Sequence, residues 1–213
     1  GRADAWAATV TGVAALARIA TSNGITFVHV SSDYVFDGTL DRPYREDDQV
    51  CPLGVYGQTK TAGDAAVATV PRHYIVRTSW VIGDGNNFVR TMASLAERGI
   101  DPSVVNDQFG RLSFTEDIAA GIVHLLSTRP EYGVYNLTNE GDSMSWAEIA
   151  KLVYAGRGHD PLRVSGISTA EYFAGKQVAP RPSNSRLALG KIQSTGYSPR
   201  KAIEALSTYL QAT

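Results

Sequence analysis

The chain has 213 residues, of which 43% are hydrophobic and 19% charged, and its formal net charge at neutral pH is -1. That composition excludes a disordered chain, and the balanced charge excludes the basic surface that nucleic acid or an anionic membrane requires. No apolar run approaches the roughly 20 residues of a membrane span, and the single cysteine, Cys51, leaves no internal disulfide and fits a cytoplasmic protein.

The first part of the chain alternates helix patterns with strand patterns. Apolar residues at helical spacing predict helices, and short β-branched apolar runs predict buried parallel strands. In chain order the sequence predicts a helix from Trp6 that stops at Asn23-Gly24, a strand over 25–30, a polar loop over 37–55, a helix over 56–68 and a strand over 73–77.

The second part continues this alternation as far as residue 137. It predicts a helix after the turn 84–87, a short strand at 104–105, a helix capped by Thr115, a strand over 132–137, a helix opened by the capping box Ser145–Glu148 and a final helix from Ser198. Residues 156–185 are irregular. Alternating strands and helices predict right-handed βαβ units, and so an α/β fold with a parallel sheet covered by helices.

One stretch offers acid–base chemistry at the end of a predicted strand. Ser31 and Ser32 follow the strand over 25–30, and ligands of doubly wound sheets bind beyond the carboxyl ends of the strands. Tyr56 and Lys60 stand at i and i+4, so both side chains leave one face of one helix. A cation within about 4–6 Å lowers the pKa of a phenol from about 10, which predicts that Lys60 activates Tyr56. The Ser32 hydroxyl is then placed to hold the substrate oxygen that Tyr56 protonates.

Several segments carry a resemblance to a known family. They are Val30–Gly38, Val55–Gly63, Arg77–Gly83, Gly85–Phe88, Val105–Gly110 and Arg181–Ser185, and they follow the family's order across nearly the whole chain. On these motifs the chain resembles the extended short-chain dehydrogenase/reductase family and, within it, the dTDP-4-dehydrorhamnose reductases. Trp80 and the run Asn106–Gln108 favour these reductases over the sugar-nucleotide epimerases.

The resemblance implies a fold and a division into domains. It implies a Rossmann-like doubly wound parallel sheet with a smaller C-terminal substrate-binding lobe. Residues 1–136 would be a truncated NAD(P)-binding domain, with residues 79–105 partly lining the substrate cleft, and residues 137–213 would be the lobe. The sequence contains no glycine-rich loop that could meet a pyrophosphate at a helix N-terminus. We therefore expect the chain to lack the family's first strands and that loop, and to be inactive on its own.

The resemblance also implies roles for individual residues. It implies that Tyr56, Lys60 and Ser32 are catalytic, with Tyr56 as proton donor, and that Tyr56, Lys60 and Ser31 contact the nicotinamide cofactor. The substrate would be bound by Ser32, Asp33, Trp80, Asn106, Gln108 and Arg181. The implied reaction is the NADPH- or NADH-dependent reduction of the C4 ketone of dTDP-4-dehydrorhamnose to dTDP-L-rhamnose, for cell-surface polysaccharide.

Other partners and functions follow from the same resemblance. It allows a Mg²⁺ ion, without a residue to hold it, and a homodimer or a fusion or association with a preceding pathway enzyme. Two alternatives stay open, a non-catalytic nucleotide-binding regulatory subunit of the same family and a sugar-nucleotide epimerase or dehydratase.

Histidines and acidic runs predict no further site. His29 lies inside a strand pattern and His124 inside a helix pattern, where packing is the expected role. Residues 46–48 are an acidic run in a loop, which predicts a solvated surface. The sequence holds no metal-ligand spacing, so no metal site is predicted.

Overall fold

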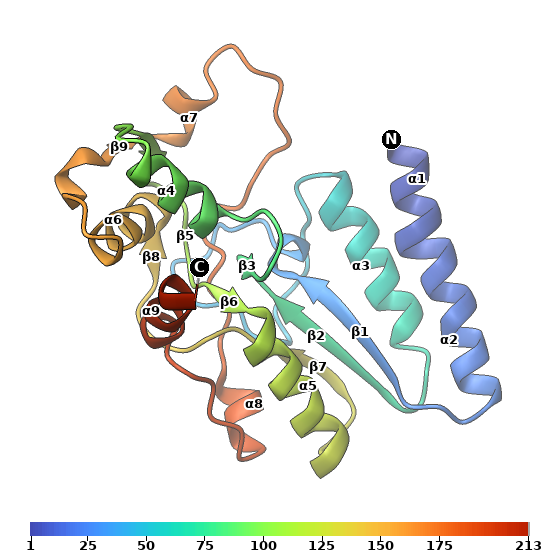
Figure 1. The fold of residues 1–213 in the computed structure, drawn as a ribbon. Helices are drawn as coiled ribbons and strands as arrows, with labels where there is room; N and C mark the ends of the chain where they lie inside the picture. Colours follow the sequence, from blue (N-terminus) through green and yellow to red (C-terminus); the bar gives the residue numbers. More distant parts are fainter. Residues whose placement is uncertain (213) are drawn as a thin grey trace.

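The computed structural model describes residues 1–212, and its largest sheet consists of parallel strands. Their order is β1 (Phe27–Ser32), β2 (His73–Thr78) and β7 (Gly133–Asn136), as Figure 1 shows. The central strand, β2, is buried along almost its whole length, as expected of a strand with helices on both faces. The prediction of an α/β fold with a Rossmann-like parallel sheet is confirmed.

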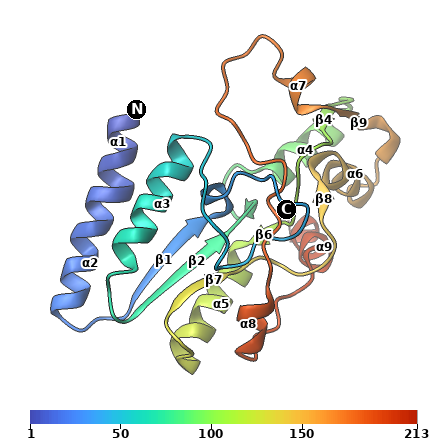
Figure 2. The same ribbon diagram turned by 180° about the vertical axis from the view of Figure 1, so that it is seen from behind.

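Helices cover both faces of this sheet (Figures 1 and 2). They are α2 (Gly12–Ser22), α3 (Val55–Val67), α5 (Thr115–Thr128) and α8 (Gly190–Ser194), while α1 (Arg2–Trp6) lies beside α3. Asp64 of α3 accepts hydrogen bonds from Ser31 of β1 and Arg77 of β2. α5 packs instead on residues that the strands turn to the other face, such as Val76. The sheet is therefore covered on opposite faces by α3 and α5.

α1 and α2 form one rod, joined by a π-helical turn over residues 7–11. The turn lies against α3, where the Thr9 carbonyl is 2.7 Å from the position of a β-carbon on Gly63. Only a glycine at that position allows the two backbones to approach so closely. π-helical turns occur frequently at functional sites, and this one lies behind the helix that carries Tyr56 and Lys60.

A second core joins three helices. They are α4 (Phe88–Glu97), α6 (Trp146–Gly156) and α9 (Ala202–Ala212). Short strands surround this core: β3 (Val81–Ile82) pairs with β6 (Ser113–Phe114), β4 (Ser103–Val105) with β9 (Ser165–Ile167), and β5 (Phe109–Gly110) with β8 (Met144–Ser145). α7 (Thr169–Tyr172) and the segment after it extend away from the core (Figure 1). The second core draws on both sides of residue 137, and the division into 1–136 and 137–213 stays a prediction.

The structure differs from the predicted elements mainly at their ends. β1 ends later than predicted, so Ser31 and Ser32 belong to the strand. α5 begins at Thr115, but no side chain caps it, because Phe114 occupies the cap position. The last helix begins at Ala202 rather than just after the predicted Ser-Pro start. The capping box that opens α6 is confirmed.

Within residues 1–212, no helix combines the length and the apolar composition that crossing a bilayer requires.

Candidate active site

A pocket of about 420 Å³ opens at the carboxyl ends of β1 and β2, and we name it the strand-end pocket. Its lining is Val30, Ser31, Ser32, Asp33, Tyr34, Tyr56, Lys60, Thr78, Ser79, Trp80, Val81 and Trp146. Every predicted catalytic and cofactor residue is in this set. The local structure places them there, because β1 ends at Ser32 and Tyr56 lies in the first turn of α3.

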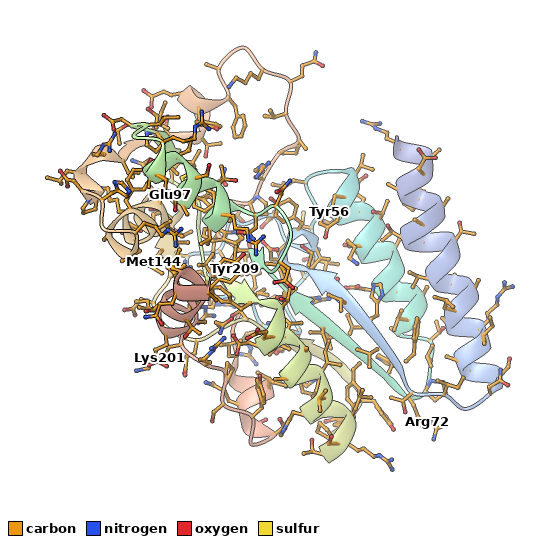
Figure 3. All side chains as sticks on the ribbon, in the orientation of Figure 1. Tyr56, Arg72, Glu97, Met144, Lys201 and Tyr209 are labelled. Carbon is orange, nitrogen blue, oxygen red and sulfur yellow. The ribbon has the colours of Figure 1, made fainter. Side chains whose placement is uncertain are left out.

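Tyr56 lies at the start of α3 (Figure 3), and the Ser32 hydroxyl is within hydrogen-bond reach of its hydroxyl. Although the residue is 54% exposed, desolvation of its hydroxyl end raises the pKa of Tyr56. The Ser32 hydrogen bond lowers this pKa in part, and the charges of Asp33 and Asp64 raise it further. The phenol therefore keeps its proton at neutral pH, which is the form that donates a proton.

Lys60 follows Tyr56 by one turn and donates a 2.6 Å hydrogen bond to the Val30 carbonyl. Burial lowers the pKa of Lys60, and the charge of Asp64 raises it. The prediction that Lys60 lowers the pKa of Tyr56 is wrong for this structure, because the ammonium group binds the strand and burial of the phenol dominates. An ammonium group has three N–H donors, so two remain for a ligand in the pocket.

Ser31 and Ser32 point to opposite faces of β1. The Ser31 hydroxyl donates to Asp64 Oδ2 at 2.9 Å, and the Ser32 hydroxyl donates to Asp33 Oδ1 at 3.0 Å. Burial raises the pKa of Asp33 to about 6, and the Ser185 and Ser32 hydroxyls lower it in part. Among residues 1–212, no group makes a hydrogen bond of ordinary geometry to Asp33 Oδ2. A buried carboxylate oxygen in that state is costly and calls for an explanation in function.

Two tryptophans form one wall of the strand-end pocket. The rings of Trp80 and Trp146 stack with centroids 3.7 Å apart and planes 16° apart. Trp80 has a φ of 47°, in the left-handed region that costs about 1–3 kcal/mol and clusters at functional sites. Its ring lies 2.7 Å from the position of a β-carbon on Gly110, so glycine at that position makes room for it.

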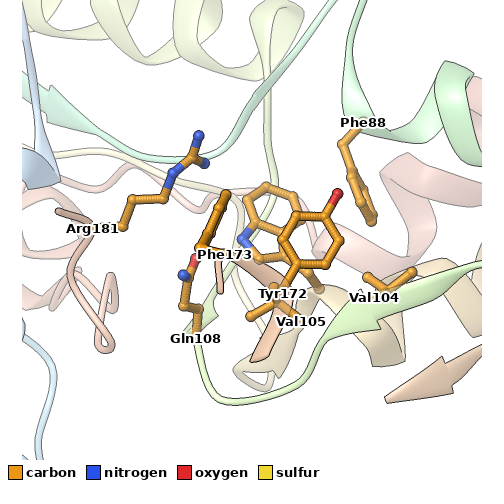
Figure 4. Close-up of a pocket in the computed structure, with 8 residues that line it drawn as sticks. Phe88, Val104, Val105, Gln108, Tyr172, Phe173 and Arg181 are labelled. Atoms are coloured by element: carbon orange, nitrogen blue, oxygen red, sulfur yellow. The ribbon is translucent and has the colours of Figure 1, made fainter. Parts of the chain in front are cut away.

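A second pocket, of about 350 Å³, shares Trp146 with the first, and we name it the aromatic pocket. Its lining is Phe88, Val104, Val105, Gln108, Trp146, Tyr172, Phe173 and Arg181. Figure 4 shows aromatic rings gathered around the cavity, with Arg181 and Gln108 toward one side of it. Flat apolar walls with a few polar groups suit a planar heteroaromatic ligand.

Arg181 connects the two pockets. Its guanidinium lies 5.9 Å from the ring centroid of Phe173 in the aromatic pocket. It also lies close enough to the hydroxyl of Tyr34, a residue of the strand-end pocket, for its charge to lower the pKa of that phenol in part. The ring of Tyr34 meets that of Tyr56 edge to face at 5.6 Å. A cation therefore lies near one residue of each pocket.

The predicted substrate residues fall into three groups. Ser32, Asp33 and Trp80 line the strand-end pocket, and Gln108 and Arg181 line the aromatic pocket. The structure brings the remaining one, Asn106, to neither pocket; it is exposed beside β9. Its role in binding stays a prediction.

Sequence analysis missed several residues that line the pockets. Trp146 follows the capping serine of α6 and reads as an ordinary first residue of a helix. Phe88 reads as an apolar residue on the inner face of α4. Tyr172 and Phe173 lie in the stretch without a pattern, where only aromatic content could have indicated a binding wall.

Metal binding finds no support in the part of the chain that the structure describes. No group of three or more His, Cys, Asp or Glu side chains within residues 1–212 is arranged to hold an ion. His29 is buried with its Nε2 3.5 Å from Asp64 Oδ1, and His124 Nε2 lies 2.9 Å from the Thr195 hydroxyl. Both histidines are packed, as predicted, and the Mg²⁺ ion that the resemblance allows has no site assigned to it.

Comparisons with known proteins agree with the motifs. Residues 1–213 match the family described as the RmlD substrate binding domain. A dTDP-4-dehydrorhamnose reductase of Salmonella typhimurium is 40% identical over 191 residues, covering 86% of this chain and 64% of the relative. The spore coat polysaccharide biosynthesis protein SpsK of Bacillus subtilis is 40% identical over 193 residues, covering 90% of this chain and 66% of the relative.

Solved structures show the same relationship. A dTDP-4-dehydrorhamnose reductase from Bacillus anthracis, in complex with NADP, matches with a TM-score of 0.88 at 33% identity, over 96% of this chain and 72% of that chain. The chain spans between 64% and 67% of the length of the first three curated relatives. With a family match over its whole length, the chain belongs to the RmlD substrate-binding domain family.

Proposed function

We propose that the protein reduces the C4 ketone of dTDP-4-dehydrorhamnose to dTDP-L-rhamnose, with NADPH or NADH as hydride donor. The observation that carries this proposal is the convergence of Tyr56, Ser32 and Lys60 on a pocket joined by Arg181 to an aromatic one. The names of the relatives support the choice of substrate. We assign the reaction to the cytoplasm, and a homodimer or an association with a preceding pathway enzyme stays a prediction.

Tyr56 supplies the proton that ketone reduction adds to the carbonyl oxygen. Burial keeps its phenol protonated at neutral pH, and the Ser32 hydroxyl lies within hydrogen-bond reach of it. A carbonyl oxygen placed between these two hydroxyls accepts a hydrogen bond from Tyr56, and a second from Ser32 once its single proton turns away from Asp33 Oδ1.

The strand-end pocket fits a nicotinamide nucleotide beside Lys60. The ammonium group uses one donor on the Val30 carbonyl and keeps two for ribose hydroxyls. Val30 is 44% exposed, so this side of the pocket is open along β1. When bound, the cofactor supplies the hydride; Lys60 and Tyr56 would hold its ribose, with Ser31 beside them.

The aromatic pocket suits the thymine base of the substrate. Its rings offer flat surfaces for stacking, and Gln108 offers an amide oxygen to an N–H of the base. Gln108 is held in place because its Nε2 donates to the Thr169 hydroxyl at 3.0 Å. Arg181 would bind the diphosphate, and Asp33, which lines the strand-end pocket, would bind a sugar hydroxyl.

The test is turnover by the complete gene product. Tyr56→Phe should oxidise NADPH with the keto-sugar at least about 100-fold more slowly than wild type, because the proton donor is lost. Tyr197→Phe is the matched control: its hydroxyl donates to the Asp117 carbonyl, outside both pockets, and its rate should equal that of wild type. A Tyr56→Phe variant as fast as wild type would show that the roles are wrong.

A further inference from the structure

A line of polar residues runs along α3 from the strand-end pocket into the interior. Tyr56, Lys60 and Asp64 are spaced by four residues, so their side chains lie on one face of the helix. Tyr56 is exposed, Lys60 partly buried and Asp64 buried. The proposed reaction uses the first two and leaves the buried carboxylate without a role.

Asp64 joins α3 to the two strands that end at the pocket. Its Oδ2 accepts a 2.9 Å hydrogen bond from the Ser31 hydroxyl of β1. The same oxygen lies 3.5 Å from Arg77 Nε of β2, and its Oδ1 lies 3.5 Å from His29 Nε2 of β1. Moving this carboxylate therefore moves the helix relative to both strands.

The contacts of Asp64 are poor as a device for stability. The distance to Arg77 is long for a charge-assisted hydrogen bond. Within residues 1–212, neither Asp64 Oδ1 nor His29 Nε2 makes a hydrogen bond of ordinary geometry. Buried ion pairs are often no more stabilising than the apolar residues that could replace them. A carboxylate buried at this cost, one turn beyond Lys60, points to a role in the site.

We propose that Asp64 is a positioning residue: its buried carboxylate anchors α3 to β1 and β2 and sets where Lys60 and Tyr56 meet Ser32. Its charge acts in the same direction, because it raises the pKa of Lys60 against burial and adds to the raised pKa of Tyr56. Asp64 thereby favours the protonated form of both groups. The inference rests on the proposed ketone reduction.

Other charged or titratable groups surround Tyr56, Lys60 and Asp64, and their charges still act on Tyr56 and Lys60 when Asp64 is neutralised. They are His29 on β1, Arg77 on β2, Asp33 and Tyr34 in the turn after β1, Glu46 in the following loop and Arg181 beside Tyr34. Asp33 still raises the pKa of Tyr56 in the absence of Asp64, so the change expected on removing Asp64 is partial.

The test is Asp64→Asn in the complete gene product. The variant should fold, lose about tenfold in kcat with KM little changed, and shift the alkaline limb of its kcat profile to lower pH. Asp117→Asn is the matched control, an aspartate of α5 that accepts from Asn139 and Arg200 away from both pockets. It should leave kcat and the pH profile unchanged.

A second readout does not depend on turnover. The tyrosinate absorbance of each protein, minus that of the same protein carrying Tyr56→Phe, gives the pKa of Tyr56 directly, and Asp64→Asn should lower it. If wild type fails to reduce the ketone while this pKa still moves, the proposed function fails and the effect of Asp64 stands. An unchanged pKa together with kcat within twofold of wild type would overturn the proposal.

A double variant serves as the control for misfolding. Asp64→Asn leaves the Arg77 charge buried without its partner, which can unfold the protein, whereas Asp64→Asn with Arg77→Met removes both charges. The double variant should fold and still show the low kcat and the shifted pH limb. If both variants fail to fold, Asp64 supports the whole domain rather than the site, and the proposal is overturned.

Discussion

Asp33→Asn should stabilise the protein at neutral pH while weakening substrate binding. Asp33 is 3% exposed, and burial raises its pKa from 3.8 to about 6. A shift of that size corresponds to about 1–3 kcal/mol of penalty on the charged form. Asparagine has no charge to bury and keeps an oxygen that accepts from the Ser32 hydroxyl. The gain in stability comes with the loss of a ligand-binding group, a common trade-off in active sites.

The sign of the pH dependence follows from the direction of the shift. The folded state binds the Asp33 proton more tightly than the unfolded state. The stability that this carboxyl contributes is therefore fully present below its unfolded pKa of 3.8 and lost as pH rises through about 6. Wild type and Asp33→Asn should differ most at pH 7 and converge as the solution is acidified through that window.

Urea unfolding of both proteins at a series of pH values measures the effect. Asp48→Asn is a control of opposite sign, because the hydrogen bonds from Arg42 and the Arg45 N–H lower the pKa of Asp48 to about 2. That carboxyl stabilises the fold above its unfolded pKa, so its removal should destabilise the protein at pH 7. An Asp33→Asn variant that is less stable than wild type at pH 7, or a difference that does not change with pH, would refute the reasoning.

Two further predictions concern the backbone near Tyr56 and the cation between the pockets. Gly57→Ala would place a β-carbon against the Tyr34 carbonyl, so it should lower the free energy of unfolding in urea by several kcal/mol or lower kcat by displacing the start of α3. Gly190→Ala is the control: the glycine has open space around it in α8, so the variant should be neutral or slightly stabilising. Equal stability of the two variants would contradict the close approach. Arg181→Ala should weaken the binding of dTDP at least about tenfold by calorimetry and raise KM more than it lowers kcat, and unchanged dTDP affinity would remove Arg181 from the diphosphate position.

The sequence predicts the parallel sheet well and the second core poorly. The strands β1 and β2 each hold a short, mostly apolar and β-branched or aromatic run between helical patterns, so their length and composition place them. β3, β5, β6 and β8 hold only two residues each, which is too short for any alternation to be visible. They exist because distant segments pack around α4, α6 and α9, and that packing is a property of the tertiary fold.

The same division holds for the candidate site. Ser32, Tyr56 and Lys60 could be predicted because one strand end and one helix turn bring them together locally. Trp146 could not, because its part in both pockets depends on stacking with Trp80, which precedes it by a long stretch of chain. The motif could not predict the direction in which the pKa of Tyr56 shifts either, because that shift depends on burial rather than on the spacing to Lys60.

The most direct test of the central claim follows the hydride itself. The complete gene product is incubated with dTDP-4-dehydrorhamnose and a nicotinamide cofactor deuterated at the transferred position, and the sugar is examined by NMR. Ketone reduction predicts one deuterium at C4 of a dTDP-6-deoxyhexose for each cofactor oxidised. A keto-sugar of inverted configuration without deuterium, or binding without any change in the sugar, would contradict the proposed reduction.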